Sequence, residues 1–277
     1  INFNKLANVV TLAQLSRHIE SENQLAEVMT DFWANHFNVF ARKGQVKFHA
    51  GHYVESVLRK NALGNFQDLL IGTAQHPAML FYLDNAQSRA APNAAELARQ
   101  AKRRGKTKRR VKGLNENYAR ELLELHSVGV NGGYTQQDGI EVARVLTGWT
   151  AQGAASGGAF QFRAAVHDKG NKVVMSQRFG PGIDEGIKML RFLALHPKTG
   201  THLGQKLCQR FVADAPPPDC VQAVAAAHQS SRGDIGAMLR AMVKAPSFYA
   251  APQSKLKTPL EFLTSALRIV DAKTVAD

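Results

Sequence analysis

The sequence predicts an all-α protein, a multi-helix orthogonal or bundle-like array with one small β-hairpin insertion. Apolar residues recur at spacings of three and four over most of the chain, which is typical of amphipathic helices. Capping signals and prolines mark where many of these segments begin and end. A glycine-rich stretch at residues 153–182 instead contains two short strand-like runs.

The first helical pattern covers residues 5–40. Ser21 and Gln24 have the spacing of a capping box that opens a helix inside this region. That helix carries one broad apolar and aromatic stripe, made of Leu25, Met29, Phe32, Trp33, His36, Phe37 and Phe40. We therefore expect it to pack into the core.

Further helices are predicted at residues 49–63, 66–76, 77–84, 115–128 and 135–148. Pro77 suits the first turn of a helix, and Gly129 is a natural stop after residue 128. Thr135 with Asp138 forms a second capping-box signal. After the glycine-rich stretch, helices are predicted at residues 183–195, 198–212, 219–229, 235–244 and 255–270.

In the glycine-rich stretch, the strand-like runs 159–162 and 172–175 flank residues 167–171. This order predicts a β-hairpin with a turn-forming loop. The whole chain, residues 1–277, is expected to form one domain. Within it we distinguish a basic flexible loop (86–113), a central helix pair (114–150), the β-hairpin insertion (153–182) and the carboxy-terminal helices (183–277). Because the first residue is Ile1, we expect the chain to begin inside a longer precursor.

Charge is concentrated in one place. The formal net charge is +13, and residues 99–112 hold nine basic residues and no acidic ones, which leaves 13 − 9 = +4 for the rest. The proposed anion-binding residues of this run are Arg103, Arg104, Arg109 and Arg110. No aromatic residue lies within it to stack on bases, so nucleic acid is not favoured. A solvated loop, or contact with an anionic surface or polysaccharide, remains open.

No run of eighteen apolar residues is present, so the sequence predicts no membrane span. Cys208 and Cys220 lie outside any Cys-x-x-Cys motif, which argues against metal or redox chemistry. They are able to pair if the protein is exported, but two buried thiols are the favoured interpretation.

Several sequence blocks together resemble the Domain of Unknown Function 1800 family. They are residues 32–37 (FWANHF), 77–85 (PAMLFYLDN), 115–126 (NENYARELLELH), 134–135 and 143–149 (ARVLTGW), then His167-Asp168, Lys172, Gly180 and His196-Pro197. The blocks keep the family's order, although its usual amino-terminal portion is missing. The resemblance implies an exported, periplasmic or secreted bacterial protein. It also implies a co-encoded exported partner resembling alkaline phosphatase and sulfatase relatives, but no particular reaction.

The predicted helix 115–128 carries the densest polar grouping. At about 100° per residue, Glu116, Arg120, Glu124, Asn117 and Glu121 share a wedge of roughly 140°. The spacing of Glu116, Arg120 and Glu124 predicts an acid–Arg–acid ladder. These groups and Glu121 are candidate catalytic residues in a cleft, but a structural ion network is the favoured alternative.

Three histidines need separate treatment. On a continuous α-helix His126 points about 140° away from Glu121, so we expect it on the packed side rather than in a shared site. His36 lies in the aromatic stripe, where it is either a satisfied core residue or a pocket residue. His167 and Asp168 are either turn residues or a pair that a loop delivers to a cleft.

No nucleophile elbow, Walker loop or dinucleotide motif is present, and nothing indicates a metal or a cofactor. Three hypotheses remain. The first is an enzyme that acts on a glycan or ester through Glu116, Arg120, Glu121, Glu124, His36, His167 and Asp168. The second is a non-enzymatic scaffold or partner-binding module, and the third is an anion-binding protein that uses residues 99–112.

Overall fold

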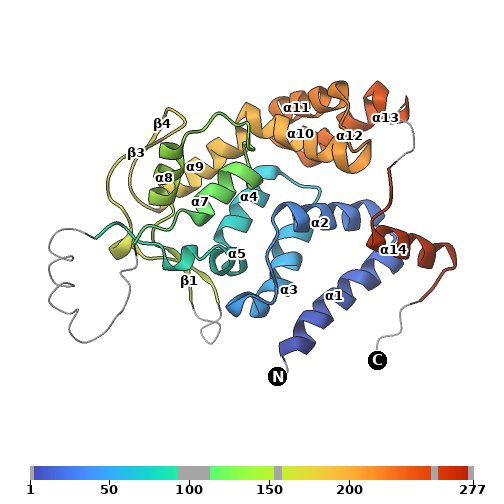
Figure 1. Cartoon of the computed structure of the whole chain (residues 1–277), viewed down its shortest axis with the longest axis horizontal. Coiled ribbons are helices and arrows are strands. Elements are labelled where there is room, and N and C mark those ends of the chain that lie inside the picture. Colours follow the sequence, from blue (N-terminus) through green and yellow to red (C-terminus); the bar gives the residue numbers. More distant parts are fainter. Residues whose placement is uncertain (1–2, 93–112, 153–157, 251–254, 274–277) are drawn as a thin grey trace.

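Helices dominate the fold, and the strands are confined to two small hairpins, so the predicted fold class is confirmed (Figure 1). The computed structural model describes residues 3–92, 113–152, 158–250 and 255–273. Most of the predicted basic loop, including Arg103, Arg104, Arg109 and Arg110, lies outside these residues. Among the described helices, none has both the length and the apolarity needed to cross a membrane.

The first helices build a core around the aromatic stripe. They are α1 (Phe3–Glu20), α2 (Gln24–His36), the 3₁₀-helix η1 (Gly44–Phe48), α3 (Ala50–Tyr53), the π-helix η2 (Val54–Arg59), α4 (Phe66–Gln75) and α5 (Pro77–Tyr82). Met29 and Trp33 are fully buried on α2, and the Trp33 indole donates a hydrogen bond to the Ala62 carbonyl at 3.0 Å. The stripe predicted from the sequence is therefore a core surface, although Leu25 and Phe40 are exposed.

The central helix pair follows a short 3₁₀-helix, η3 (Asn85–Gln87). Its first member is α7 (Asn117–Glu121), which continues as a π-helix, η4 (Leu122–His126), and its second is α8 (Gln136–Val145). Thr135 and Asp138 form the predicted capping box of α8. The sequence predicted one continuous α-helix over residues 115–128, and the structure replaces its second half by the π-helix.

Four short strands form two separate hairpins. β1 (Trp149–Ala151) pairs with β2 (Phe160–Phe162), and β3 (Lys172–Val174) pairs with β4 (Gln177–Phe179). Both pairs are antiparallel. The runs predicted at 159–162 and 172–175 do form strands, but they do not pair with each other. The tight turn instead lies at Met175 and Ser176, whose positive φ angles of 47° and 68° suit a two-residue hairpin.

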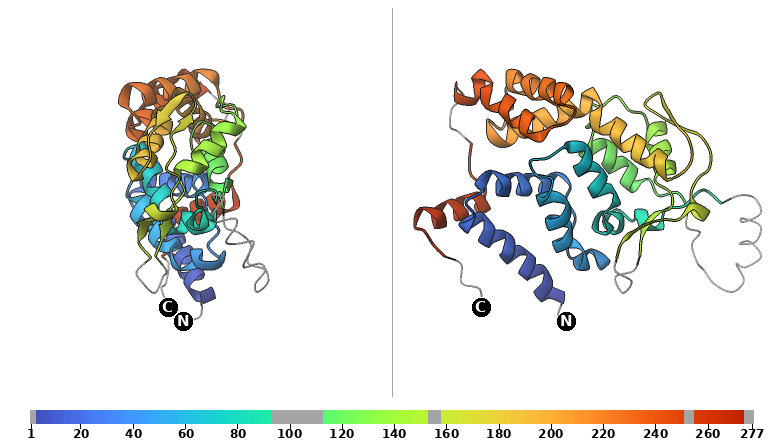
Figure 2. Two further views of the ribbon diagram at one scale, coloured as in Figure 1. Left: turned by 90° about the vertical axis from the view of Figure 1, so that its left-hand side faces the viewer. Right: turned by 180° about the vertical axis from the view of Figure 1, so that it is seen from behind.

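The carboxy-terminal part is helical. It contains α9 (Ile183–Leu195), α10 (Pro197–Phe211), α11 (Pro218–Ser231), α12 (Ile235–Lys244), α13 (Pro246–Ala250) and α14 (Pro259–Ile269). A short 3₁₀-helix, η6 (Ala164–Val166), lies earlier, between β2 and β3. Helices α10 to α13 pack together. The last helix, α14, instead lies against α1, the first helix of the sequence (Figures 1 and 2). Arg268 of α14 donates hydrogen bonds to the Ile19 and Ser21 carbonyls.

Cys208 of α10 and Cys220 of α11 form a disulfide, with their Cα atoms 6.2 Å apart. The interpretation as two buried thiols is therefore wrong. The two helices pack closely and bring the cysteines together, and no local sequence pattern reports this packing. Both residues are fully buried, so the disulfide lies inside the helical pair.

Replacing both cysteines (Cys208→Ala with Cys220→Ala) should lower the free energy of unfolding by about 2–4 kcal/mol, because the cross-link restricts the unfolded chain. Urea unfolding with and without dithiothreitol measures this difference. The double variant should be insensitive to the reductant. Equal stability of the oxidised and reduced wild-type protein would contradict the prediction.

Candidate functional site

The polar centre of the molecule lies at the end of the π-helix η4. A π-helix has more residues per turn than an α-helix, so side chains after Glu121 no longer follow steps of 100°. As a result His126 and Glu121 line the same pocket. His126 is buried, with an exposed fraction of 4%, as expected for the packed side of the helix. The expected separation from Glu121 assumed one continuous α-helix, and the π-helix instead brings both residues to this pocket.

Two histidines from other helices bond the end of η4. The Nε2 atom of His36 lies 3.2 Å from the His126 carbonyl oxygen, and that of His202 lies 3.1 Å from the Leu125 carbonyl oxygen. A carbonyl oxygen only accepts, so both Nε2 atoms carry a proton. The last carbonyl groups of a helix have no hydrogen-bond donor within the helix. Here each of the two imidazoles donates to one of these carbonyls.

A pocket of about 320 Å³ opens beside this helix end. We call it the central pocket, and its lining residues are Asn35, His36, Asn38, Lys43, Tyr82, Leu83, Asn117, Glu121, Leu125 and His126. They come from α2, the segment after it, α5 and its end, and the helix α7–η4. Among the described lining residues Glu121 is the one carboxylate. Lys43 is paired with Asp84 at 2.9 Å and also bonds the Tyr82 carbonyl.

Burial keeps the imidazoles of this pocket uncharged. Desolvation lowers the pKa of His126 to about 3, and the same cause lowers the pKa of His36 well below its usual value. The neighbouring rings of His126 and His202 lower the pKa of His36 further, and His202 also lowers that of His126. The buried Nδ1 atom of His126 has no hydrogen-bond partner in the described part of the chain.

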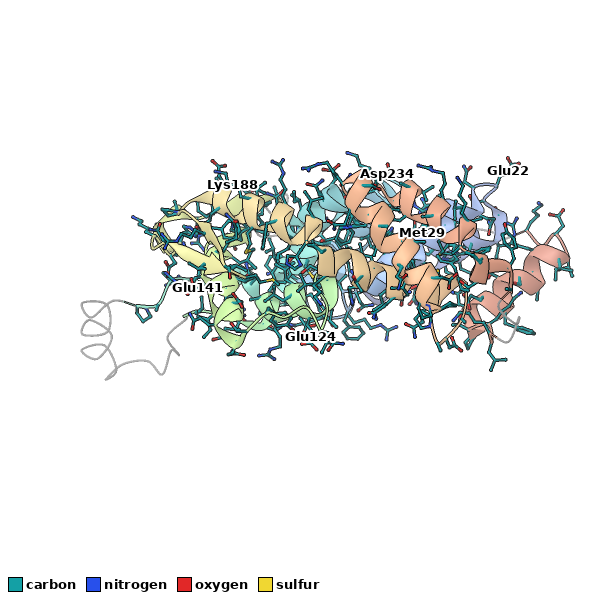
Figure 3. All side chains as sticks on the ribbon, turned by 90° about the horizontal axis from the view of Figure 1, so that it is seen from above. Glu22, Met29, Glu124, Glu141, Lys188 and Asp234 are labelled. Carbon is teal, nitrogen blue, oxygen red and sulfur yellow. A yellow bond between two sulfur atoms is a disulfide. The ribbon has the colours of Figure 1, made fainter. Side chains whose placement is uncertain are left out.

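The predicted acid–Arg–acid ladder does not form. Arg120 is exposed and makes no ion pair with Glu116 or Glu124 within the described residues. The Glu116 carboxylate accepts a hydrogen bond from Gln136 at 3.2 Å, which joins α7 to α8. Glu124, which is labelled in Figure 3, lies on η4 but does not line the central pocket. Burial raises the pKa of Tyr134, and the nearby carboxylates Glu124 and Glu121 raise it further.

Asp168 belongs to a second polar group, which holds the β3–β4 hairpin to the helices. Its carboxylate accepts two hydrogen bonds from Arg144, each 3.0 Å long, and Arg144 also pairs with Glu141 at 2.7 Å. The Asp168 side chain accepts a further bond from the Gly170 amide, as in an ordinary turn. The Arg144 guanidinium and this amide hold the pKa of Asp168 below its usual value, against the opposing effect of desolvation.

His167 lies in the same group and is buried. Its Nδ1 atom lies 2.8 Å from the Thr147 carbonyl oxygen, so this nitrogen is the donor. Its Nε2 atom lies 3.0 Å from the Glu185 carboxylate, which also pairs with Lys172 at 2.7 Å. Both Lys172 and Glu185 are almost fully buried, with exposed fractions of 0% and 2%. We call His167, Asp168, Arg144, Lys172 and Glu185 the hairpin network.

Of the predicted catalytic residues, His36 and Glu121 therefore share the central pocket, and His167 and Asp168 do not line it. No group of three or more potential metal ligands occurs among the residues that the structure describes.

A family model described as "Protein of unknown function (DUF1800)" matches residues 2–277. The chain belongs to this family. No curated protein and no solved structure matched the chain. The membership agrees with the resemblance of the sequence blocks, three of which, residues 32–37, 77–85 and 115–126, meet at the central pocket of this DUF1800 protein.

Sequence reasoning missed several residues of the central pocket. Lys43, Tyr82 and Asn117 line it, yet each lies in a different part of the chain. Tyr82 and Asn117 fall within blocks that resemble the family, and Asn117 also belongs to the polar wedge of its helix, although neither was proposed as a site residue. The ion pair between Lys172 and Glu185 was also missed. A lysine beside two valines in a strand gives no sign that it pairs with a glutamate thirteen residues later.

Replacing Lys172 by alanine should lower the free energy of unfolding by about 3–5 kcal/mol, because Glu185 is then buried without its lysine partner. Lys169→Ala is the matched control, since Lys169 is exposed nearby. Thermal and urea unfolding measure the difference. The double change Lys172→Met with Glu185→Leu should recover much of the loss, and equal effects of K172A and K169A would refute this account.

Proposed function

We propose that the central pocket is a glycan-binding active site in which Glu121 is the acid–base residue. The observation that carries the proposal is the convergence of one carboxylate, two uncharged imidazoles and three side-chain amides on one pocket. The amides are those of Asn35, Asn38 and Asn117. This combination is suited to an uncharged ligand with many hydroxyl groups.

Hydrogen-bond chemistry supports a carbohydrate. A side-chain amide both donates and accepts, as a sugar hydroxyl does, so asparagines match such groups in either direction. The two histidines are neutral near pH 7, because burial lowers their pKa values. The charge of Lys43 is offset by Asp84. Little net charge therefore remains at the pocket apart from Glu121.

The reaction proposed is hydrolysis by water with acid–base help from Glu121. No Ser, Thr or Cys is among the described lining residues, which argues against an ester-cleaving nucleophile of the protein. Glycosidases commonly use two carboxylates. Among the described lining residues Glu121 is the one carboxylate, so the proposed reaction assigns the acid–base role to it. His126 lines the same pocket, and its buried Nδ1 has no hydrogen-bond partner within the described residues.

A second candidate is partner binding through α14, supported by its exposed apolar side chains. Phe262 and Ile269 of α14 have exposed fractions of 68% and 83%, and Leu256, just before the helix, has one of 88%. Exposed apolar patches are typical of protein contacts. The partner we propose is the co-encoded exported protein that resembles alkaline phosphatase and sulfatase relatives.

We also propose a periplasmic or secreted location, which the Cys208–Cys220 disulfide supports because such bonds persist in oxidising compartments. Anion binding by Arg103, Arg104, Arg109 and Arg110 remains a prediction, since these residues lie outside the described part of the chain.

Replacing Glu121 by glutamine should reduce glycan hydrolysis by ~10²–10⁴-fold, because the proton-transfer group is lost and the shape is kept. The measurement is release of reducing ends from a panel of bacterial polysaccharides, together with oligosaccharide binding by calorimetry. Glu124→Gln is the matched control, since Glu124 is on the same helix but outside the pocket. Equal activity of E121Q and E124Q would overturn the role of Glu121, and a wild-type protein that binds no saccharide would overturn the proposed substrate class.

Replacing Phe262 and Ile269 together by serine should abolish co-purification with the proposed partner if α14 is its docking surface. Val130→Ser is the control, because Val130 is similarly exposed (67%) but far from α14 in the sequence. Unchanged co-purification of the double variant would exclude α14 as the contact.

A further inference from the structure

A second pocket, separate from the central pocket, lies between η1, α3, α4, α5 and β2. Its volume is about 670 Å³. It is lined by Phe48, His49, His52, Gly72, Gln75, His76, Pro77, Gly158, Ala159 and Phe160. Three of these are histidines, and we call it the three-histidine pocket. None of its residues is shared with the central pocket.

Two of the histidines have fixed protons. His76 Nδ1 accepts a hydrogen bond from the Ala78 amide at 3.2 Å, so the proton of its neutral ring is on Nε2. That Nε2–H points at His52 Nδ1, 2.9 Å away, which therefore accepts and leaves the His52 proton on Nε2. A second proton on His76 would face the Ala78 amide donor, and burial lowers the pKa of His76 to about 3.

His49 is different. It is nine-tenths buried, with an exposed fraction of 9%, and its Nε2 atom has no hydrogen-bond partner among the described residues. Gly158 packs directly on its ring, since a Cβ atom at Gly158 would lie 2.3 Å from His49 Cε1. Of the three imidazoles, His49 is thus the one free to take up a proton and to bond a ligand.

The charge around His49 is one-sided. No Asp or Glu is among the described lining residues, and the other titratable groups that line the pocket are His52 and His76. Lys47 lies on η1, two residues before His49 in the sequence. Burial lowers the pKa of His49, and the neighbouring His52 lowers it further. A negative group in the pocket would offset both effects. Apart from the histidines and Gln75, the lining residues are apolar, and Phe48 and Phe160 are aromatic.

We propose that the three-histidine pocket binds a small aromatic carboxylate. The carboxylate bonds protonated His49 and the Nε2–H of His52, and the apolar body packs beside Phe48 and Phe160. Binding takes up one proton, at His49. Affinity therefore rises as the pH falls, by about tenfold per unit while the pH stays above the pKa of His49 in the empty protein.

Benzoate is the probe for the experiment, and benzamide is its uncharged counterpart of the same shape. NMR titration of the imidazole C–H signals in the intact protein gives both affinities at pH 7.5 and 6.5. Benzoate should bind about tenfold more tightly at pH 6.5, whereas benzamide should bind weakly at both values. Equal binding of the two compounds, or benzoate binding that does not change with pH, would overturn the proposal without any variant being made.

His49→Gln should remove benzoate binding, and His18→Gln, the same substitution on α1, should leave it intact. Normal binding by folded H49Q would also overturn the proposal. A third arm adds Zn²⁺ alone. If the metal saturates the three histidines at one equivalent and displaces benzoate, the pocket is a cation site and the proposal is wrong.

Discussion

The architecture of the centre depends on satisfying the carbonyl groups that η4 leaves free at its end. Two of these carbonyls, on Leu125 and His126, accept hydrogen bonds from His202 and His36. Unpaired buried carbonyls are costly, so the imidazoles hold α2 and α10 against the end of η4. The central pocket opens at this junction. Its shape therefore rests on the same contacts that complete the helix.

Histidine serves mainly as a hydrogen-bonding group in this fold. Besides the two at η4, His228 bonds the Ala194 carbonyl at 2.9 Å, and His76 and His196 accept from amides at the first turns of α5 and α10. Burial lowers the pKa values of these rings, so they act as neutral donors or acceptors. Against this background, the unpartnered nitrogens of His126 and His49 mark the two pockets.

Some charged side chains are buried in an ion-pair network, whereas Glu121 lines a pocket without an ion-pair partner among the described residues. The hairpin network buries Lys172 and Glu185 together, and such a pair is stable only when both members are present. It joins the β3–β4 hairpin to α8 and α9, which makes the role of His167 and Asp168 structural. Glu121 differs because no ion pair engages it within the described chain and it faces a pocket. The carboxylate proposed for acid–base chemistry is thus different from the carboxylates that hold the hairpin in place.

Sequence by itself determined the helical fold class, the α8 capping box, the Pro77 helix start and the family, because each rests on local spacing or local residue type. It also marked His36 and Glu121 as candidates. Only the tertiary structure decided that His126 joins them, since the π-helical turn changes the direction of its side chain and residues distant in the chain bond the carbonyls at its end. The Cys208–Cys220 disulfide likewise follows from the packing of α10 on α11, which no local pattern records.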